Sequence, residues 1–379
     1  MQLETFPYTP DSEWSCKVLP ALDSDQTLVI IFGAPSFIDA PEPIHEITRA
    51  YPNAHIVGCS TSGEVLGTTI SDESLAVGVI RFERTTVATA IAAVQMTDKS
   101  YAAGETLACQ LHRPSLRGVF ILSDGQRVNG SELVRGINSV LPSSTIVTGG
   151  LAGDGARFKN TWVLKDGTPH RGFISAVGFY GDRVEITHGS KGGWDRFGPE
   201  KVVTRSKGSV LYEIDGEPAL ELYKEYLGDR AAGLPATALL FPLSLRANPS
   251  TEVRVVRTVL GVDEQAQSMT FAGDIPQGYL AQFMWAGLDR LINGARESAL
   301  MARARRMSTA PILSIAISCV GRRLVLGDRT EEELEATLNT LPKGTQQIGF
   351  YSHGEISPYQ TGYCDLHNQT MTLTVIGEK

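Results

Sequence analysis

The chain has 379 residues, of which 42% are hydrophobic and 20% are charged, and its formal net charge is −8. This composition is typical of a globular protein, whereas the negative charge disfavours a nucleic-acid partner, which requires a basic surface. No apolar run reaches the roughly 18 residues of a membrane helix, and the first residues lack the basic and apolar regions of a signal peptide, so we expect a protein with no membrane partner.

The cysteine pattern indicates neither a zinc site nor covalent haem attachment. Five cysteines are widely spaced along the chain, and no two of them form a C-x-x-C motif. They are Cys16, Cys59, Cys109, Cys319 and Cys364. An odd number of cysteines fits reduced, mainly structural thiols, and we therefore expect a cytoplasmic protein.

After an N-terminal arm, the chain predicts a strand, a helix and a second strand. Residues 27–32 are a short continuous apolar run closed by Gly33, which is typical of a strand buried on both faces. Residues 41–51 have a helical pattern, and residues 55–57 form the next strand. A glycine-containing turn follows and ends at Glu64. Two further strands are predicted at residues 75–81 and 86–94.

The same order of elements occurs twice more. The second copy has a strand, a helix, a strand, a turn and a strand at residues 118–122, 131–141, 145–148, 149–154 and 173–180. The third copy has them at residues 312–317, 331–341, 347–349, 349–355 and 371–376. Two strands joined through a helix are expected to be parallel, because such crossovers are right-handed. The strand after each turn is expected to return antiparallel.

The turns of the first and third copies match residue by residue. The matching pairs are Gly58 and Gly349, Gly63 and Gly354, and Glu64 and Glu355. Asp154 is predicted to take the place of these two acids in the second turn. The repeats predict an α/β fold with some α+β character, in which β-α-β-turn-β units build two domains with mixed, mostly parallel sheets.

The region between the second and third copies, residues 181–311, has a different pattern. Residues 280–306 carry its longest helical pattern. A turn at residues 215–217 leads into a helix that has a proline at its first position, and we place a domain boundary there. The predicted organisation is an N-terminal arm at 1–27, an N-terminal domain at 28–216 and a C-terminal domain at 217–379.

Several motifs, taken in order, carry a family resemblance. They are Gly58-Cys59-Ser60-Thr61-Ser62-Gly63-Glu64, Gly149-Gly150-Leu151-Ala152-Gly153-Asp154, Phe241-Pro242-Leu243, Ser318-Cys319-Val320-Gly321-Arg322, Gly349-Phe350-Tyr351-Ser352-His353-Gly354-Glu355-Ile356 and Leu366-His367-Asn368-Gln369-Thr370-Met371-Thr372-Leu373. On these motifs the chain resembles the FIST family, with an N-terminal FIST region at about 28–216 and a C-terminal one at about 217–377. The resemblance implies a sensory module of signal transduction that binds a small ligand, an amino acid being the usual proposal. It also implies a second expectation, because stand-alone bacterial members include haem-binding nitric-oxide sensors that act on histidine kinases.

His353 is the candidate for direct contact with a ligand. It lies in a turn after a buried strand, between Tyr351 and Glu355. A neutral imidazole there would ligate haem iron or hydrogen-bond another ligand, and Tyr351 would form a wall of the pocket. The alternative is a histidine whose hydrogen bonds are satisfied by the local backbone.

The three acids of the turns offer a second chemistry. Glu64, Asp154 and Glu355 are expected either to converge in one cleft and bind the amine of an amino acid, or to cap neighbouring backbone N–H groups. Convergence would require a cation or a shared proton, because like charges packed together repel one another.

Cys319 and Arg322 follow the first strand of the third copy. A nearby arginine lowers the pKa of a thiol, which suits a thiolate haem ligand or a reactive thiol, whereas a buried free cysteine is commonly an apolar filler. Arg322 would pair with a ligand carboxylate, with a haem propionate or with Glu355. The full candidate set for ligand binding is Gly58, Cys59, Ser60, Thr61, Glu64, Gly150, Asp154, Cys319, Arg322, Tyr351, His353 and Glu355.

Motifs of catalysis are absent from the sequence. No serine lies in a G-x-S-x-G motif, and the chain has neither a dinucleotide-binding fingerprint nor a P-loop. A cysteine-dependent enzyme that uses Cys319 with His353 is the weaker alternative. We therefore expect a binding protein whose ligand is haem with nitric oxide or, alternatively, an amino acid; an interaction scaffold without a ligand is the third hypothesis.

Overall fold

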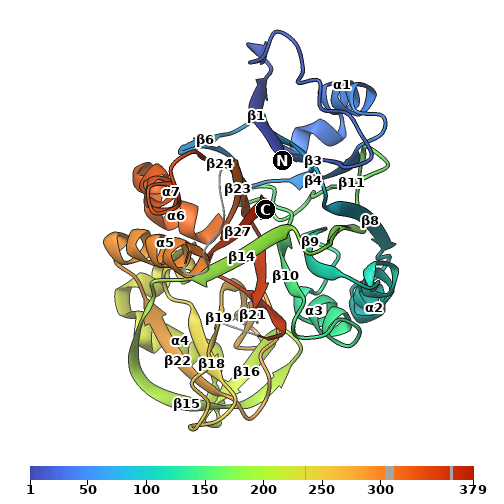
Figure 1. Ribbon diagram of the computed structural model, residues 1–379. Coiled ribbons are helices and arrows are strands. Elements are labelled where there is room, and N and C mark those ends of the chain that lie inside the picture. Colours follow the sequence, from blue (N-terminus) through green and yellow to red (C-terminus); the bar gives the residue numbers. More distant parts are fainter. Residues whose placement is uncertain (235, 304–310, 359–361) are drawn as a thin grey trace.

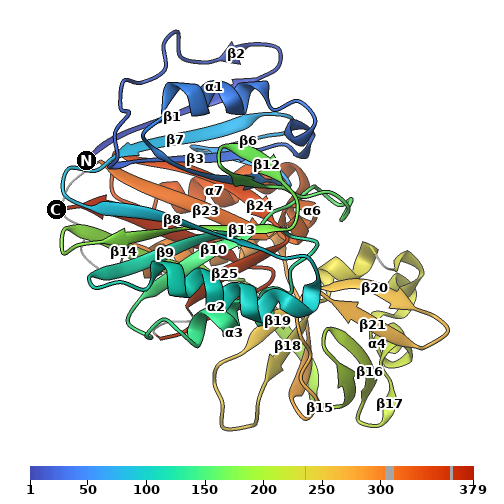
Figure 2. The same cartoon turned by 90° about the vertical axis from the view of Figure 1, so that its right-hand side faces the viewer.

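Three mixed β-sheets pack around a common hydrophobic core, and a fourth sheet forms a separate domain (Figures 1 and 2). A computed structural model of the chain describes residues 1–234, 236–303, 311–358 and 362–379. In Figure 2 the blue first sheet lies at the top, the orange third sheet beneath it and the teal and green second sheet below that, while the yellow fourth sheet lies at the lower right. We call the first three sheets with their helices the three-sheet body, and residues 195–285 the fourth-sheet domain.

The first sheet is built around the buried strand β3. In pairing order its strands are β12 (Thr168–His170), β11 (Val163–Lys165), β4 (His55–Ser60), β3 (Thr27–Gly33), β7 (Leu75–Arg81), β1 (Gln2–Thr9) and β2 (Glu13–Trp14). Helix α1 (Glu42–Ala50) joins β3 to β4 and covers one face. Leu28 and Ile30 of β3 face the common core while Val29 and Ile31 pack with α1, which explains why this strand is apolar throughout.

The second and third sheets repeat this plan. In the second, the order is β26 (Cys364–His367), β25 (Gly354–Pro358), β10 (Ile146–Leu151), β9 (Leu116–Ser123), β13 (Phe173–Tyr180) and β8 (Thr86–Ala93), with helices α2 (Ser100–Leu111) and α3 (Gly130–Asn138). In the third, it is β14 (Val184–Lys191), β27 (Met371–Glu378), β23 (Ile312–Cys319), β24 (Thr345–Ser352), β5 (Glu64–Leu66) and β6 (Thr69–Ser71), with helices α5 (Leu288–Arg303), α6 (Val320–Leu326) and α7 (Thr330–Leu338). Each sheet therefore has a helix-joined strand pair at its centre.

The three units exchange one hairpin each in a cyclic order: β5–β6, β11–β12 and β25–β26 each extend the sheet of another unit. Strand β5 of the first unit pairs with β24 in the third sheet, β11 of the second unit pairs with β4 in the first sheet, and β25 of the third unit pairs with β10 in the second sheet. The core between the sheets is shared in the same way: the rings of Phe32 and Phe350, from the first and third units, lie 4.7 Å apart. The exchange makes the three-sheet body one folding unit.

The predicted mixed α/β fold is confirmed, but its parallel pairs are fewer than expected. In the described part of the chain, each of the first three sheets holds one parallel pair: β3 with β4, β9 with β10, and β23 with β24. Each pair is joined through one or two helices, as parallel strands require. The neighbours of these pairs are antiparallel, because they arrive through tight turns or from another unit.

The fourth-sheet domain has its own core. In pairing order its strands are β19 (Val255–Arg257), β18 (Leu243–Arg246), β22 (Leu280–Trp285), β15 (Asp195–Lys207), β16 (Val210–Ile214), β21 (Ser268–Phe271) and β20 (Val259–Asp263), and β17 (Glu217–Pro218) pairs with β16 beside helix α4 (Ala219–Leu227). Its core includes Val203, Tyr223 and Phe283. The chain enters this domain through residues 192–194 and leaves it through residues 286–287.

The prediction of one helix over residues 280–306 is wrong in its first part. Leu280–Trp285 is strand β22, which pairs on both sides with β15 and β18, and helix α5 starts only at Leu288. A strand in the middle of a sheet is held by its neighbours, which overrides the weak local preference for helix. Residues 304–306 lie outside the described residues. No helix in the described ranges has the length and apolarity needed to cross a bilayer.

Candidate functional site

The three turns that the sequence singles out lie side by side in the three-sheet body. Each follows the second strand of its unit, and each donates a backbone N–H to a carbonyl of another unit. The hydrogen bonds run from Ser62 N to Tyr351 O (2.8 Å), from Gly153 N to Ser60 O (2.9 Å) and from His353 N to Leu151 O (3.1 Å). This closed ring holds segments together that are far apart in the sequence.

The strand before each turn carries a glycine in the same register. An added Cβ atom would lie 2.4, 1.9 or 1.8 Å from the carbonyl oxygen of the facing residue on the parallel neighbour. The three glycines and the residues that they face are Gly58 and Ile31, Gly149 and Ile121, and Gly349 and Ala316. The predicted correspondence of Gly58 with Gly349 is therefore confirmed, and the reason for glycine is the close approach of two backbones.

Glu64 and Glu355 are buried and are bound in the same manner. Glu355 accepts hydrogen bonds from Ser352 Oγ (2.7 Å), Thr370 N (3.1 Å) and Thr370 Oγ1 (2.9 Å). The corresponding partners of Glu64 are the side chain of Thr61 and both the backbone and the side chain of Ser74. Ser74 and Thr370 each precede the last strand of their unit, so both carboxylates fasten a turn to that strand.

Glu64 and Glu355 give the protein a predicted pH dependence. Burial raises the pKa of each carboxyl from its ordinary value of 4.5 to about 7. Between pH 4.5 and 7 each carboxyl holds a proton in the folded chain that it releases in the unfolded chain. Its stabilising contribution to the free energy of unfolding is therefore complete below pH 4.5 and is lost as the pH rises through 7. For Glu355 this loss amounts to about 3 kcal/mol of the free energy of unfolding of the native chain between pH 4.5 and 7. The Glu355→Gln variant should not show this loss when its unfolding by urea is measured across the same pH range. The exposed Glu335→Gln controls for charge, and identical profiles for the native chain and Glu355→Gln would contradict the prediction.

Asp154 is not equivalent to these two glutamates, and this part of the sequence interpretation is wrong. In the strand register it corresponds to Gly63 and Gly354. Its carboxylate accepts backbone N–H bonds of 2.7 to 2.9 Å from Phe158, Lys159 and Asn160. The acid that fastens the second unit is Asp124, whose Oδ2 accepts from Gly172 N (2.7 Å) directly before β13. All of these acids bind backbone N–H groups.

The two cysteines among the candidates are buried in packed surroundings. Cys59 belongs to the common core, and burial raises the pKa of its thiol well above the ordinary value. Burial and the nearby Glu355 raise the pKa of Cys319 in the same direction. Both thiols are therefore held in the protonated form, which is neither nucleophilic nor a good metal ligand.

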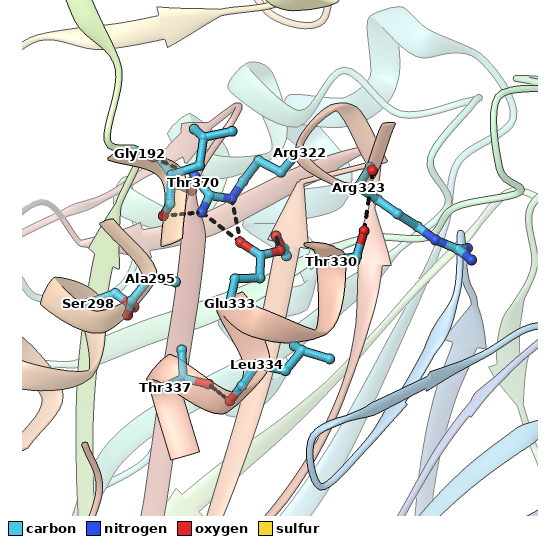
Figure 3. Close-up of polar contacts among 12 residues, drawn as sticks. Gly192, Ala295, Ser298, Arg322, Arg323, Thr330, Glu333, Leu334, Thr337 and Thr370 are labelled. Carbon is cyan, nitrogen blue, oxygen red and sulfur yellow. Dashed lines mark hydrogen bonds and ion pairs between the residues drawn. The ribbon is translucent and has the colours of Figure 1, made fainter. Parts of the chain in front are cut away.

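Arg322 forms a fully buried ion pair with Glu333 (Figure 3). Its Nη2 lies 2.6 Å from Glu333 Oε2, and its Nε lies 3.0 Å from the same oxygen. The guanidinium also donates to the backbone carbonyls of Gly192 and Leu291. Tyr351 donates its hydroxyl to the other oxygen of Glu333 at 2.6 Å. Arg322 therefore binds inside the protein rather than to Glu355.

His353 has partners at both ring nitrogens. Its Nε2 lies 3.1 Å from the carbonyl oxygen of Gly155 and 3.4 Å from both Oδ1 and the backbone N of Asp154. The two oxygens can only accept, which favours the tautomer with the proton on Nε2. Its Nδ1 lies 3.1 Å from the side-chain nitrogen of Gln126 and accepts from it. Burial lowers the pKa of His353, so the ring is neutral near pH 7. The ring of Phe158 stacks on it, with centroids 4.5 Å apart.

Two adjoining cavities lie between the three-sheet body and the fourth-sheet domain. The larger, of about 670 Å³, is lined mainly by aliphatic side chains, among them Leu324 and Val325 of the body and Leu234, Leu239 and Val259 of the domain. The smaller, of about 320 Å³, is lined by His353, Gln126 and Asn129 of the body and by Thr270 of the domain. Phe158 and Leu260 line both. We call the two cavities together the interdomain cleft.

Phe158 divides the interdomain cleft and has a strained backbone. Its φ angle is 52°, in the left-handed region that costs a residue with a side chain about 1–2 kcal/mol. The hydrogen bond from Phe158 N to Asp154 Oδ1 (2.9 Å) holds this conformation. Strain of this kind is concentrated at ligand sites, and here it places an aromatic ring between the two cavities.

Comparison with known proteins identifies the family. A FIST N domain matches residues 27–217, and a FIST C domain matches residues 219–358. The chain belongs to the FIST family. FIST domains are sensory domains that bind small ligands in signal transduction, and this FIST protein has both of them. No curated protein matches the chain. Among solved structures, a cyanuric acid hydrolase from A. caulinodans is similar over 93% of this chain and 90% of its own, with 6% identity and a TM-score of 0.36, a likeness too distant to define fold or chemistry.

The residues around His353 in this FIST protein do not fit haem, which the resemblance implied. An axial histidine needs a free ring nitrogen, but both nitrogens of His353 are engaged by Gln126 and Gly155. Cys319 is 4% exposed, and its thiol is protonated.

The predicted site residues of this FIST protein are separated by the structure into different places. His353 lines the interdomain cleft, whereas Thr61, Glu64 and Asp154 line another pocket of about 300 Å³. The others lie in the core or in backbone contacts: Gly150 faces Glu355 across the β10–β25 pair, and Ser60 Oγ accepts from Trp162 N.

Sequence reasoning missed Phe158, Gln126 and Leu260, which line the cleft beside His353. Only Phe158 had a usable signal, because it is a large apolar residue in a loop of small and charged ones. Gln126 and Leu260 are ordinary residues whose position depends on the packing of the fourth-sheet domain against the body.

Proposed function

We propose that this FIST protein is a cytoplasmic sensor that binds a small ligand in the interdomain cleft and reports its presence to a signalling partner such as a histidine kinase. The observation that carries the proposal is the cleft itself, because its walls come from both the three-sheet body and the fourth-sheet domain. Ligand pockets occur preferentially at such domain interfaces and have volumes of this order. Unpaired cysteines support the cytoplasmic location.

The way in which the fourth-sheet domain is attached supports signalling by a change of shape. Two short connections, residues 192–194 and 286–287, join it to the three-sheet body. A ligand that contacts Leu324 of the body and Leu240 of the domain at the same time stabilises the relative orientation of the two parts in which both residues can be contacted. The partner would then recognise the angle between the two parts.

Binding explains the structure better than catalysis does. The cysteine-dependent enzyme considered from the sequence requires Cys319 to exchange a proton with His353. Each group has other partners, since His353 is bound to Gln126 and Gly155 while Cys319 lies beside Glu355.

The substitution Leu260→Trp is expected to weaken binding of any cleft ligand about tenfold or more, because the larger side chain occupies space in both cavities. The measurement is the rise in melting temperature produced by a panel of metabolites that includes amino acids and haem. Leu300→Trp is the matched control, since Leu260 and Leu300 are both 43% exposed and Leu300 lies on α5 away from the cleft. If a ligand raises the melting temperature of Leu260→Trp as much as that of the native chain, it binds outside the cleft. If haem binds the native chain, the hypothesis of a haem-based nitric-oxide sensor is supported.

A further inference from the structure

We infer that the interdomain cleft selects an uncharged ligand, with an apolar body and one hydrogen-bonding group that meets the polar side chains of Gln126 and Thr270 beside His353. The inference rests on the proposed function, and it names the class of ligand. It differs from both ligands that the family resemblance implies, because an amino acid is a zwitterion and haem carries two propionates.

The lining of the cleft carries the inference. Among the described residues that line the two cavities, none is an aspartate, glutamate, lysine or arginine. The one titratable side chain is His353, which is neutral. Burying a charge without a partner of opposite sign costs much more than burying an apolar group gains. A charged ligand would therefore lose its hydration in this cleft without compensation.

Charged residues near the cleft are engaged elsewhere. Arg157 donates its Nε to the backbone oxygen of Asp154 at 2.8 Å. Asp274 accepts a hydrogen bond from Asn129 at 3.1 Å. Arg230 lies over the ring of Phe241, 5.4 Å from its centroid. These three charged groups do not line the cleft. Asp154, whose Oδ1 lies 3.4 Å from His353 Nε2, is also outside the lining, and its carboxylate binds three backbone N–H groups. The side chains that a ligand would touch are therefore uncharged.

The two cavities divide the recognition between them. The smaller one offers the polar side chains of Gln126 and Thr270, whereas both ring nitrogens of His353 are already bound within the protein. The larger one offers aliphatic walls, among which Leu240, Leu260 and Leu324 remain 37 to 50% exposed, so a ligand that covers them gains hydrophobic free energy. The ligand is therefore expected to place its polar group near His353 and to extend past Phe158 into the larger cavity.

A matched series of three probes tests the inference. Octanamide, octanoate and octylamine share one apolar chain, and at neutral pH they are uncharged, negative and positive. Each competes with the uncharged dye N-phenyl-1-naphthylamine, whose fluorescence rises in an apolar cavity. Octanamide is expected to displace the dye at a concentration at least about tenfold lower than either charged probe.

Two variants place the result in the cleft. In Leu260→Arg the new cation in the lining should reverse the order, so that octanoate binds more tightly than octanamide. Leu300→Arg, with the same charge on α5, should leave the native order unchanged. A reversal in both variants would show that net charge alone decides the order, and would overturn the inference.

The outcomes separate the inference from the proposed function. If octanoate or octylamine binds the native chain as tightly as octanamide, and Leu260→Trp abolishes that binding, then the cleft binds ligands but the inference on charge is wrong. If neither the dye nor any probe binds, the cleft is not a ligand site and the proposed function fails as well.

Discussion

Gly349→Ala is expected to lower the free energy of unfolding by about 3 kcal/mol or more, a large effect for a single added methyl group. The new Cβ would lie 1.8 Å from the carbonyl oxygen of Ala316, and 2.7 and 3.0 Å from its carbonyl carbon and nitrogen. All three atoms belong to the backbone of the parallel neighbour β23, so no side-chain rotation relieves the contact. The strands must separate at the centre of the third sheet, which also displaces the ring of turns that begins three residues later.

Urea denaturation of the native and variant chains measures this loss. Gly261→Ala is the matched control, because Gly261 is also a strand glycine, in β20, but an added Cβ would meet no atom within 4 Å. It is expected to change stability by no more than about 0.5 kcal/mol. Equal effects for the two variants would mean that the approach of β23 and β24 does not set the requirement for glycine.

The repeated units were visible in the sequence because their signals are local. Continuous apolar runs predicted the buried strands, and the spacing of Gly58 to Glu64 recurs as Gly349 to Glu355. These features depend on residues close together in the chain, and the structure reproduces them as β3, β4, β23 and β24. The register of the strands then explains why Asp154 fails to match: its turn is one residue shorter before the acid.

The exchange of strands left no local signal. β5 and β11 are three residues long, and each pairs with a strand of another unit. Which strands they pair with depends on the packing of the common core. A sequence pattern within one segment does not indicate this packing. The interdomain cleft escaped prediction for the same reason, because Gln126 and Leu260 lie far apart in the chain and meet only when the fourth-sheet domain folds against the body.

The partner of Arg322 shows a further limit. The sequence suggested Glu355 or a ligand, yet the structure pairs it with Glu333, one of three consecutive glutamates in the first turn of α7. Consecutive residues on a helix point in different directions, so only one of the three faces the core. Which one does so depends on how α7 packs against β24, and the sequence alone does not report this.

Arg322→Met is expected to destabilise the chain by about 3–5 kcal/mol, the range for removing one partner of a buried ion pair. Both side chains are 0% exposed, and Met has a similar volume but no donor. The substitution would leave Glu333 charged in the core and remove the donors to the carbonyls of Gly192 and Leu291. Because Gly192 begins the connection to the fourth-sheet domain, the loss should also loosen the interdomain cleft. Chemical denaturation measures the first effect, and binding of the uncharged dye measures the second.

Arg329→Met is the matched control for both measurements. Arg329 also forks with a glutamate of α7, at 2.7 and 2.8 Å from Glu332, but its side chain is 38% exposed. Water replaces its hydrogen bonds, so a loss of at most about 1 kcal/mol is expected, with no change in dye binding. The double variant Arg322→Met with Glu333→Leu should recover part of the stability, because it removes the orphaned charge. The double variant should not recover dye binding, since the carbonyl of Gly192 still lacks its donor. If both stability and dye binding recover, the ion pair contributes to stability alone and does not fix residues 192–194, which connect the body to the fourth-sheet domain.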